Sequence, residues 1–128
     1  MNISFKNTEL FRSFCTIPRH PKLTEVLIWL SHLKKMELIV TSDFRSKPIH
    51  DNDPGIHGTN PLRAIDLRSW TMRNPELIEE KINKAWVYDP NRLELEVCVY
   101  HDVGQGFHFH LQVHDNTTAV ATNRGKYV

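Results

Sequence analysis

The sequence predicts an α+β domain whose small antiparallel sheet is flanked by helices. Two separated segments repeat apolar residues at helical spacing, and two segments near the C-terminus alternate apolar and polar residues around a glycine turn. The predicted helices and strands do not follow the alternating order of a parallel sheet. At 128 residues and 40% hydrophobic composition, the chain has the size of a single domain spanning residues 1–128.

Charge and hydropathy exclude two classes of partner. Sixteen Lys and Arg residues against fifteen Asp and Glu give a net charge of +1, so no basic field indicates nucleic acid. The longest apolar run, Val26 to Leu30, is far shorter than the roughly 20 residues of a membrane helix, and residues 1–14 contain no signal-peptide apolar core. We therefore expect a soluble protein made in the cytoplasm without a signal peptide, with no membrane partner. Its oligomeric state is left open.

The first half of the chain contains a predicted helix, a strand and a long loop. Apolar residues recur every three or four positions over residues 22–36, directly after Pro21. Residues 37–42 (ELIVTS) are typical of a buried strand. The stretch from there to Pro61 is rich in Pro, Gly, Asp and Asn, so we expect a functional or disordered loop.

The second half contains a strand, a helix and a hairpin. Residues 63–68 (RAIDLR) predict a strand, and residues 74–86 predict a helix in which Asn74 caps the N-terminus. Alternating residues predict strands over 93–100, with Leu93, Leu95, Val97 and Val99 on one face, and over 107–114. Residues 115–128 are expected to form a flexible tail.

The two cysteines carry no sign of a metal or redox motif. Cys15 and Cys98 do not lie in a CxxC or a zinc-knuckle spacing. We expect both to be reduced thiols.

Histidines mark the candidate site. His108 and His110 lie two residues apart on a predicted strand, so both imidazoles project from one face, with their Cα atoms about 6.5–7 Å apart. Together with His57 and Asp66, one of them completes a set of three nitrogen and oxygen ligands suited to a catalytic zinc ion. Zinc lowers the pKa of bound water to about 7, and an imidazole that does not bind the metal suits proton transfer. The pattern is typical of an amidase or peptidase.

More ordinary roles exist for the same residues. A His-x-His pair also occurs on the solvated face of an edge strand, and an Asp such as Asp66 also caps turns. His101 and Asp102, at the hairpin end, either orient a ligand of the metal or cap a strand.

The same residues resemble a known family. Residues 39–67 are similar to the TSxYRS…H…GxAxD signature of the LAS metallopeptidases, which include lysostaphin-type endopeptidases, D-alanyl-D-alanine peptidases and the hedgehog signalling domain. Residues 107–113 (FHFHLQV) resemble the closing H-x-H strand of that family. The resemblance implies a hedgehog-like or D-Ala-D-Ala-peptidase-like fold and zinc ligands His57, Asp66 and His110. It also implies a catalytic role for His108 and a contact between Arg45 and the substrate.

Three positions depart from the family pattern. The spacing from His57 to the aspartate is two residues longer than the usual H-x6-D, and His50 is an alternative ligand. Phe107 stands where several members have an acidic general base, so either His108 takes that role or activity is weak or absent. Leu62 replaces the first glycine of GxAxD.

The resemblance implies a zinc-dependent peptidase that hydrolyses a stem peptide or cross-link of bacterial cell-wall peptidoglycan. The small size is typical of a phage or prophage enzyme that acts on the wall after release or as part of a phage particle. The alternative is a non-catalytic metal-binding or structural module that keeps the peptidase fold. A zinc-free domain with solvated histidines is the third possibility.

Overall fold

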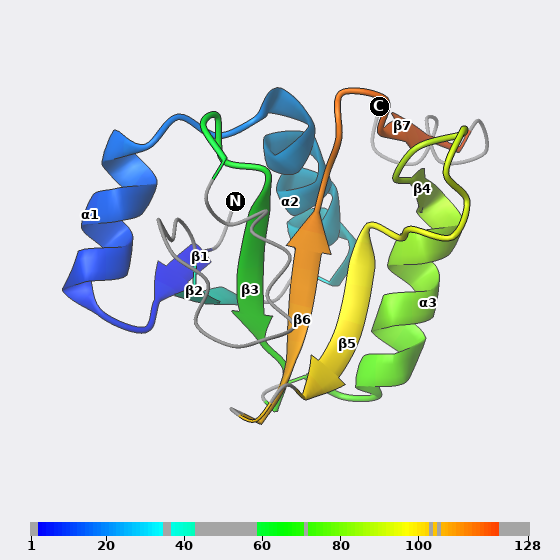
Figure 1. Ribbon diagram of the computed structural model, residues 1–128. Helices are drawn as coiled ribbons and strands as arrows, with labels where there is room; N and C mark the ends of the chain where they lie inside the picture. The colour runs from blue at the N-terminus through cyan, green and yellow to red at the C-terminus, as the bar shows by residue number, and fades with distance from the viewer. Residues whose placement is uncertain are drawn as a thin grey trace.

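The computed structural model describes residues 3–34, 37–42, 59–70, 72–102, 104 and 106–120. The elements within these residues are shown in Figure 1. In chain order they are β1 (Ile3–Phe5), α1 (Thr8–Thr16), α2 (Pro21–Lys34), β2 (Leu38–Ser42), β3 (Ala64–Arg68), α3 (Pro75–Ala85), β4 (Trp86–Val87), β5 (Cys98–Asp102), β6 (Phe107–Gln112) and β7 (Thr118–Ala119).

The main sheet has five strands in the order β1-β2-β3-β6-β5. The pairs β2/β3, β3/β6 and β5/β6 are antiparallel, whereas β1 runs parallel to β2. The predicted α+β class is confirmed, but the sheet is mixed rather than antiparallel. The parallel pair arises because α1 and α2 connect β1 to β2, and parallel neighbours need such a crossover.

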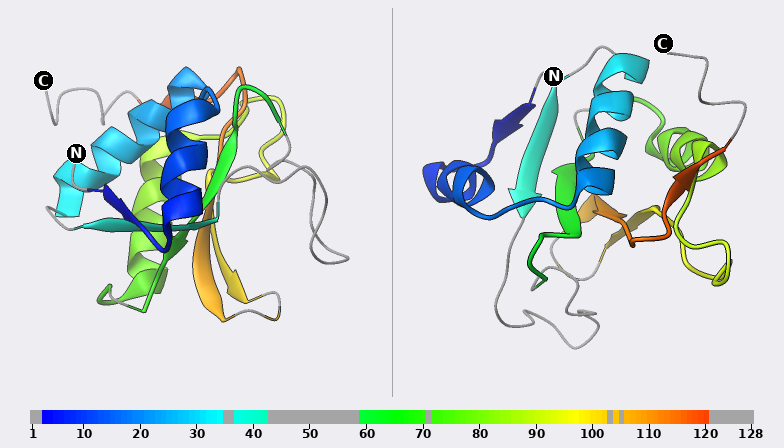
Figure 2. Two further views of the ribbon diagram at one scale, coloured as in Figure 1. Left: turned by 90° about the vertical axis from the view of Figure 1, so that its left-hand side faces the viewer. Right: turned by 90° about the horizontal axis from the view of Figure 1, so that it is seen from above.

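Helix α2 supplies much of the core. It begins at Pro21, where the missing backbone N–H of proline costs no helical hydrogen bond, and ends at Lys34. Its residues Leu23, Val26 and Leu27 are buried, as their spacing predicts. Figure 2 shows α2 and α3 on the same side of the sheet. The opposite face of the sheet is therefore not covered by these two helices.

Helix α3 begins differently from the prediction. Asn74 occupies the N-cap position, as predicted, but it adopts a left-handed conformation with φ 50° and its side chain makes no capping hydrogen bond. Its backbone carbonyl instead accepts hydrogen bonds from the N–H groups of Leu77 and Ile78. Ile78 and Ile82 are buried, whereas Leu77 is 43% exposed and lies at the margin of the apolar stripe.

Strand β5 is shorter than predicted and its inward face is different. It begins at Cys98, and Leu93 in the expected strand is 75% exposed. Val97 and Cys98 are both fully buried, so the alternation breaks there and Val99 lies opposite His110 rather than in the core. The side chain of Asn83 on α3 forms hydrogen bonds with the backbone carbonyl and N–H of Cys98, at 2.8 and 2.9 Å. The alternation of apolar residues along the strand does not reveal this contact with the helix, so the sequence pattern did not predict where β5 begins.

The start of the expected C-terminal tail is part of the fold. Strand β7 pairs with β4, and Thr117 donates a hydrogen bond to the backbone carbonyl of Tyr88 at 2.8 Å. The carboxylate of Asp115 lies 2.7 Å from Nε2 of His20, and this hydrogen bond lowers the pKa of Asp115. Residues 121–128 lie outside the described residues.

None of the described helices is both long and apolar enough to cross a bilayer.

Candidate metal centre and adjoining pocket

The pairing of β3 with β6 brings the predicted polar residues together. Asp66 lies opposite His110, and Arg68 lies opposite His108 in the antiparallel register. Alternate residues of a strand share a face, so these four side chains lie on the same face of the sheet. Their intervening neighbours, including Phe109, are buried on the face covered by the helices.

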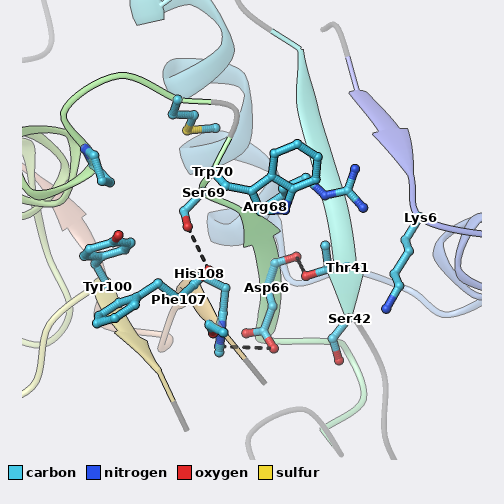
Figure 3. Close-up of a pocket in the computed structure, with 13 residues that line it drawn as sticks. Lys6, Thr41, Ser42, Asp66, Arg68, Ser69, Trp70, Tyr100, Phe107 and His108 are labelled. Atoms are coloured by element: carbon cyan, nitrogen blue, oxygen red, sulfur yellow. Dashed lines mark hydrogen bonds and ion pairs between the residues drawn. The ribbon is translucent and has the colours of Figure 1, made fainter. Parts of the chain in front are cut away.

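Asp66 is the residue on which both histidines converge. Its Oδ1 lies 3.1 Å from Nδ1 of His110, and its Oδ2 lies 3.8 Å from Nε2 of His108. Figure 3 shows His108 directed toward the carboxylate of Asp66. Asp66 is 7% exposed and His110 is 6% exposed, so these polar groups need partners to offset their loss of hydration.

The hydrogen bond at the far side of His108 determines which ring nitrogen carries a proton. Nδ1 of His108 lies 3.1 Å from the backbone carbonyl of Gly106, and a carbonyl oxygen only accepts hydrogen bonds. Nδ1 is therefore the donor, and Nε2, which faces Asp66, carries the lone pair in the neutral form of the ring. This is the form needed by a metal ligand or a general base.

His110 is oriented in a similar way by Gln112. The amide nitrogen of Gln112 donates to the backbone carbonyl of Glu96 at 2.8 Å, which leaves Oε1 of Gln112 facing Nε2 of His110 at 3.0 Å. Nε2 is therefore the donor in His110, and Nδ1 faces the carboxylate of Asp66. A lone pair on Nδ1 and a carboxylate oxygen can approach this closely only when a proton or a metal ion lies between them.

The separation between the Asp66 and His110 donor atoms is that of a hydrogen bond, and it is also close to the separation of two ligands of one zinc ion. Two ligands bound about 2.0–2.1 Å from a tetrahedral zinc ion are separated by about 3.3 Å, and the observed separation is 3.1 Å. The donors are one imidazole nitrogen and one carboxylate oxygen, which zinc accepts. The outward hydrogen bond of His110 to Gln112 also matches the support that metal-binding histidines usually receive.

Three residues of the predicted site cannot be placed relative to Asp66 and His110. His57, the alternative ligand His50, and Arg45 lie outside the described residues. In the part of the chain that the structure describes, no group of three or more His, Cys, Asp and Glu side chains is arranged to hold a metal ion. Asp66 and His110 are adjacent in the described part of the chain, and the ligand roles of these two residues and of His57 stay predictions.

His101 and Gln112 also lie beside the side chains of Asp66, His108 and His110. The ring of His101 lies 4.8 Å from that of His108 and 6.0 Å from that of His110, measured between centroids. Gln112 supports His110, as described above. The alternation of side chains along β6 puts Gln112 on the same face as His110, so the sequence pattern could have identified Gln112. The position of His101 depends on how β5 pairs with β6, which the sequence pattern does not show. Asp102 accepts hydrogen bonds from the N–H groups of Gly104 and Gly106, so it caps the turn.

A pocket of about 380 Å³ opens beside Asp66 and His108. Figure 3 shows the residues around it, which come from β2, β3, β5 and β6, from the residue after β1, and from the turn before α3 and its first residue. Its wall includes the aromatic rings of Trp70, Tyr100 and Phe107. A hollow of this size next to a reactive pair is a typical place for a small ligand or a short peptide segment.

Comparison of the chain with protein-family models, with curated proteins and with solved structures returned no match.

Proposed function

We propose that the chain is a zinc-dependent peptidase with a hedgehog-like or D-Ala-D-Ala-peptidase-like fold, which hydrolyses peptide bonds in bacterial cell-wall peptidoglycan. The observation that carries the proposal is the convergence of His108 Nε2 and His110 Nδ1 on the carboxylate of Asp66. The outward hydrogen bonds of both rings direct their inward nitrogens toward the carboxylate of Asp66. The substrate class, a stem peptide or a cross-link, rests on the resemblance to the LAS metallopeptidases.

Each residue has a distinct role in the proposal. Asp66 and His110 hold the metal ion together with His57. When bound there, zinc would supply Lewis acidity toward the scissile carbonyl and toward water. His108 accepts a proton at Nε2 and then donates it to the leaving amine, because its Nδ1 proton is held by the carbonyl of Gly106. Arg45 contacts the substrate.

The setting of the enzyme is also part of the proposal. A small domain that cuts cell-wall peptides suits a phage or prophage protein that acts after release or within a phage particle. The pocket beside Asp66 has room for a segment of a peptide rather than for a folded protein.

The proposal is tested by incubating the zinc-loaded protein with purified peptidoglycan and with synthetic stem peptides, and by measuring newly released amino groups. We expect release by the parent protein, loss of release after chelation and recovery when zinc is restored. Asp66→Asn should be inactive, whereas Glu94→Gln, which changes an exposed carboxylate in a loop, should be active. Equal release by the parent and Asp66→Asn would contradict the assignment.

The second candidate function is a non-catalytic metal-binding module. It is favoured by Phe107, which is 56% exposed at the pocket where several LAS members have an acidic side chain. Full zinc occupancy with no release of amino groups from any substrate would support the module and reject the peptidase.

A further inference from the structure

The turn between β5 and β6 lies directly before His108, and one carboxylate oxygen holds it. Oδ1 of Asp102, the last residue of β5, accepts hydrogen bonds from the backbone N–H of Gly104 at 2.8 Å and of Gly106 at 3.0 Å. Gly106 has φ 90°, a left-handed backbone conformation that glycine adopts without steric cost. Hydrogen bonds to an ionised acceptor are stronger than those to a neutral one. Asp102 therefore stabilises a turn conformation that places Gly106 two residues before His108.

The carbonyl of Gly106 is the acceptor that faces Nδ1 of His108, at 3.1 Å. Its position is limited on both sides along the backbone. On one side, the N–H of Gly106 is bonded to Asp102. On the other, the carbonyl of Phe107 accepts a 2.8 Å hydrogen bond from the hydroxyl of buried Ser69 (Figure 3). The peptide units before and after the Gly106 carbonyl are thus anchored, one to β5 and the other to the residue that follows β3.

Two acceptors compete for the single proton of the neutral His108 ring. The Gly106 carbonyl faces Nδ1 at 3.1 Å, and Oδ2 of Asp66 faces Nε2 at 3.8 Å. A proton on Nδ1 leaves the lone pair on Nε2, whereas a proton on Nε2 would be attracted by the carboxylate and would remove the basic nitrogen from the side of Asp66. The position of the Gly106 carbonyl therefore decides which of the two neutral forms predominates.

We propose that Asp102 is a positioning residue for His108, which keeps the proton of the neutral imidazole on Nδ1 by holding the backbone of Gly106. The inference rests on the proposed function, in which His108 accepts a proton at Nε2, and it adds a residue that acts through the turn. The role requires an acceptor oxygen rather than a negative charge, because both partners of Oδ1 are neutral N–H groups. Asparagine keeps such an oxygen, and alanine does not.

The test is the nitrogen-15 NMR spectrum of the imidazole groups in the purified full chain, recorded at about pH 9, where an ordinary imidazole is neutral. The protonated and the unprotonated nitrogen of a neutral ring have well-separated chemical shifts, so the spectrum reports which nitrogen carries the proton. The His108 signals are identified by their absence from His108→Ala. We expect protonation at Nδ1 in the parent and in Asp102→Asn, and a shift toward protonation at Nε2 in Asp102→Ala.

The matched control is Asn83→Ala, which removes hydrogen bonds at the other end of β5 and should leave the His108 signals unchanged. It separates a local effect on the turn from a general loss of stability of the strand. Protonation of His108 at Nε2 in the parent would overturn the inference, and this observation needs no variant that must fold. Unchanged His108 signals in folded Asp102→Ala would also overturn it, as would an equal change in Asn83→Ala.

Hydrolysis of a stem peptide by the zinc-loaded proteins separates this inference from the peptidase proposal. Asp102→Ala should be roughly three- to tenfold slower than the parent, since one neutral hydrogen bond to the ring is weakened, and Asp102→Asn should recover most of the rate. Hydrolysis by the parent with unchanged His108 signals in Asp102→Ala would retain the peptidase and reject the positioning role. The expected change of signals without hydrolysis by the parent would retain the effect of Asp102 on the ring and reject the peptidase.

Discussion

Nδ1 of His110 lies 3.1 Å from Oδ1 of Asp66, across the antiparallel pair formed by β3 and β6. Nε2 of the same ring is hydrogen-bonded to Gln112, and Nδ1 is hydrogen-bonded to the carboxylate of Asp66, at the position that a shared cation would take. At neutral pH, zinc and a proton compete for that position, since a metal ligand must be deprotonated. The relationship between these two residues is therefore the basis of the metal-site proposal.

Gln112 should control metal affinity although it is not a ligand. Gln112→Met removes the acceptor for Nε2 of His110, and loss of such support typically lowers metal affinity roughly 10- to 100-fold. Competition with a fluorescent zinc chelator measures the change. Gln112→Glu keeps an acceptor oxygen and should lose less affinity. Zinc binding by Gln112→Met that matches the parent would show that Gln112 does not support the site.

His108 should act in proton transfer rather than in metal retention. His108→Ala is expected to keep its zinc and to lose turnover, because Asp66, His110 and His57 are the proposed ligands. Metal content and hydrolysis of a stem peptide are measured on the same preparation. A fully active His108→Ala protein would remove His108 from the mechanism, and loss of its zinc would make it a ligand.

The two thiols should differ in reactivity. Burial raises the pKa of Cys98, with smaller contributions from the nearby charges of Glu79 and Glu96, whereas Cys15 is exposed. At pH 8 a chromogenic disulfide reagent should therefore react rapidly with Cys15, and with Cys98 only after unfolding. Cys15→Ser should abolish the rapid reaction. Rapid reaction of two thiols in the native parent would contradict the burial of Cys98.

Asn83 should stabilise the sheet edge. Its amide bonds the backbone N–H and carbonyl of Cys98, so Asn83→Ala leaves two buried backbone groups without these partners. We expect a loss of roughly 2 kcal/mol or more in the free energy of unfolding, measured with urea. The neighbouring exposed change Lys84→Ala should have little effect, because it disrupts only a surface ion pair with Glu80. Equal stability of the two variants would show that the Asn83 bonds contribute little.

The sequence predicted the elements with strong periodicity. Helix α2 and strands β3 and β6 lie close to their expected bounds, because apolar spacing reflects the buried face of an element directly. Helix α1 and strand β1 were not predicted. A strand of three residues has too little alternation to be recognised, and its parallel partner is set by tertiary pairing.

The candidate site was predictable only in part. His108 and His110 share a face because side chains alternate along a strand, and the sequence shows this directly. The contact between His110 and Asp66 depends on the pairing register of β3 and β6, two strands that are distant in the sequence. The same limit applies to His101 and to Arg68. The roles of His57, His50 and Arg45 stay predictions, since these residues lie outside the described part of the chain.

The most direct test of the central claim is the metal content per chain, measured by inductively coupled plasma mass spectrometry. The protein is prepared without a histidine tag or chelators, supplied with zinc and then dialysed, beside Asp66→Ala and the surface control Glu94→Ala. The proposal predicts about one zinc ion per chain in the parent and in the control, and little in Asp66→Ala. Absence of stoichiometric zinc from the parent, or equal zinc in Asp66→Ala, would contradict a metal centre built on Asp66 and His110.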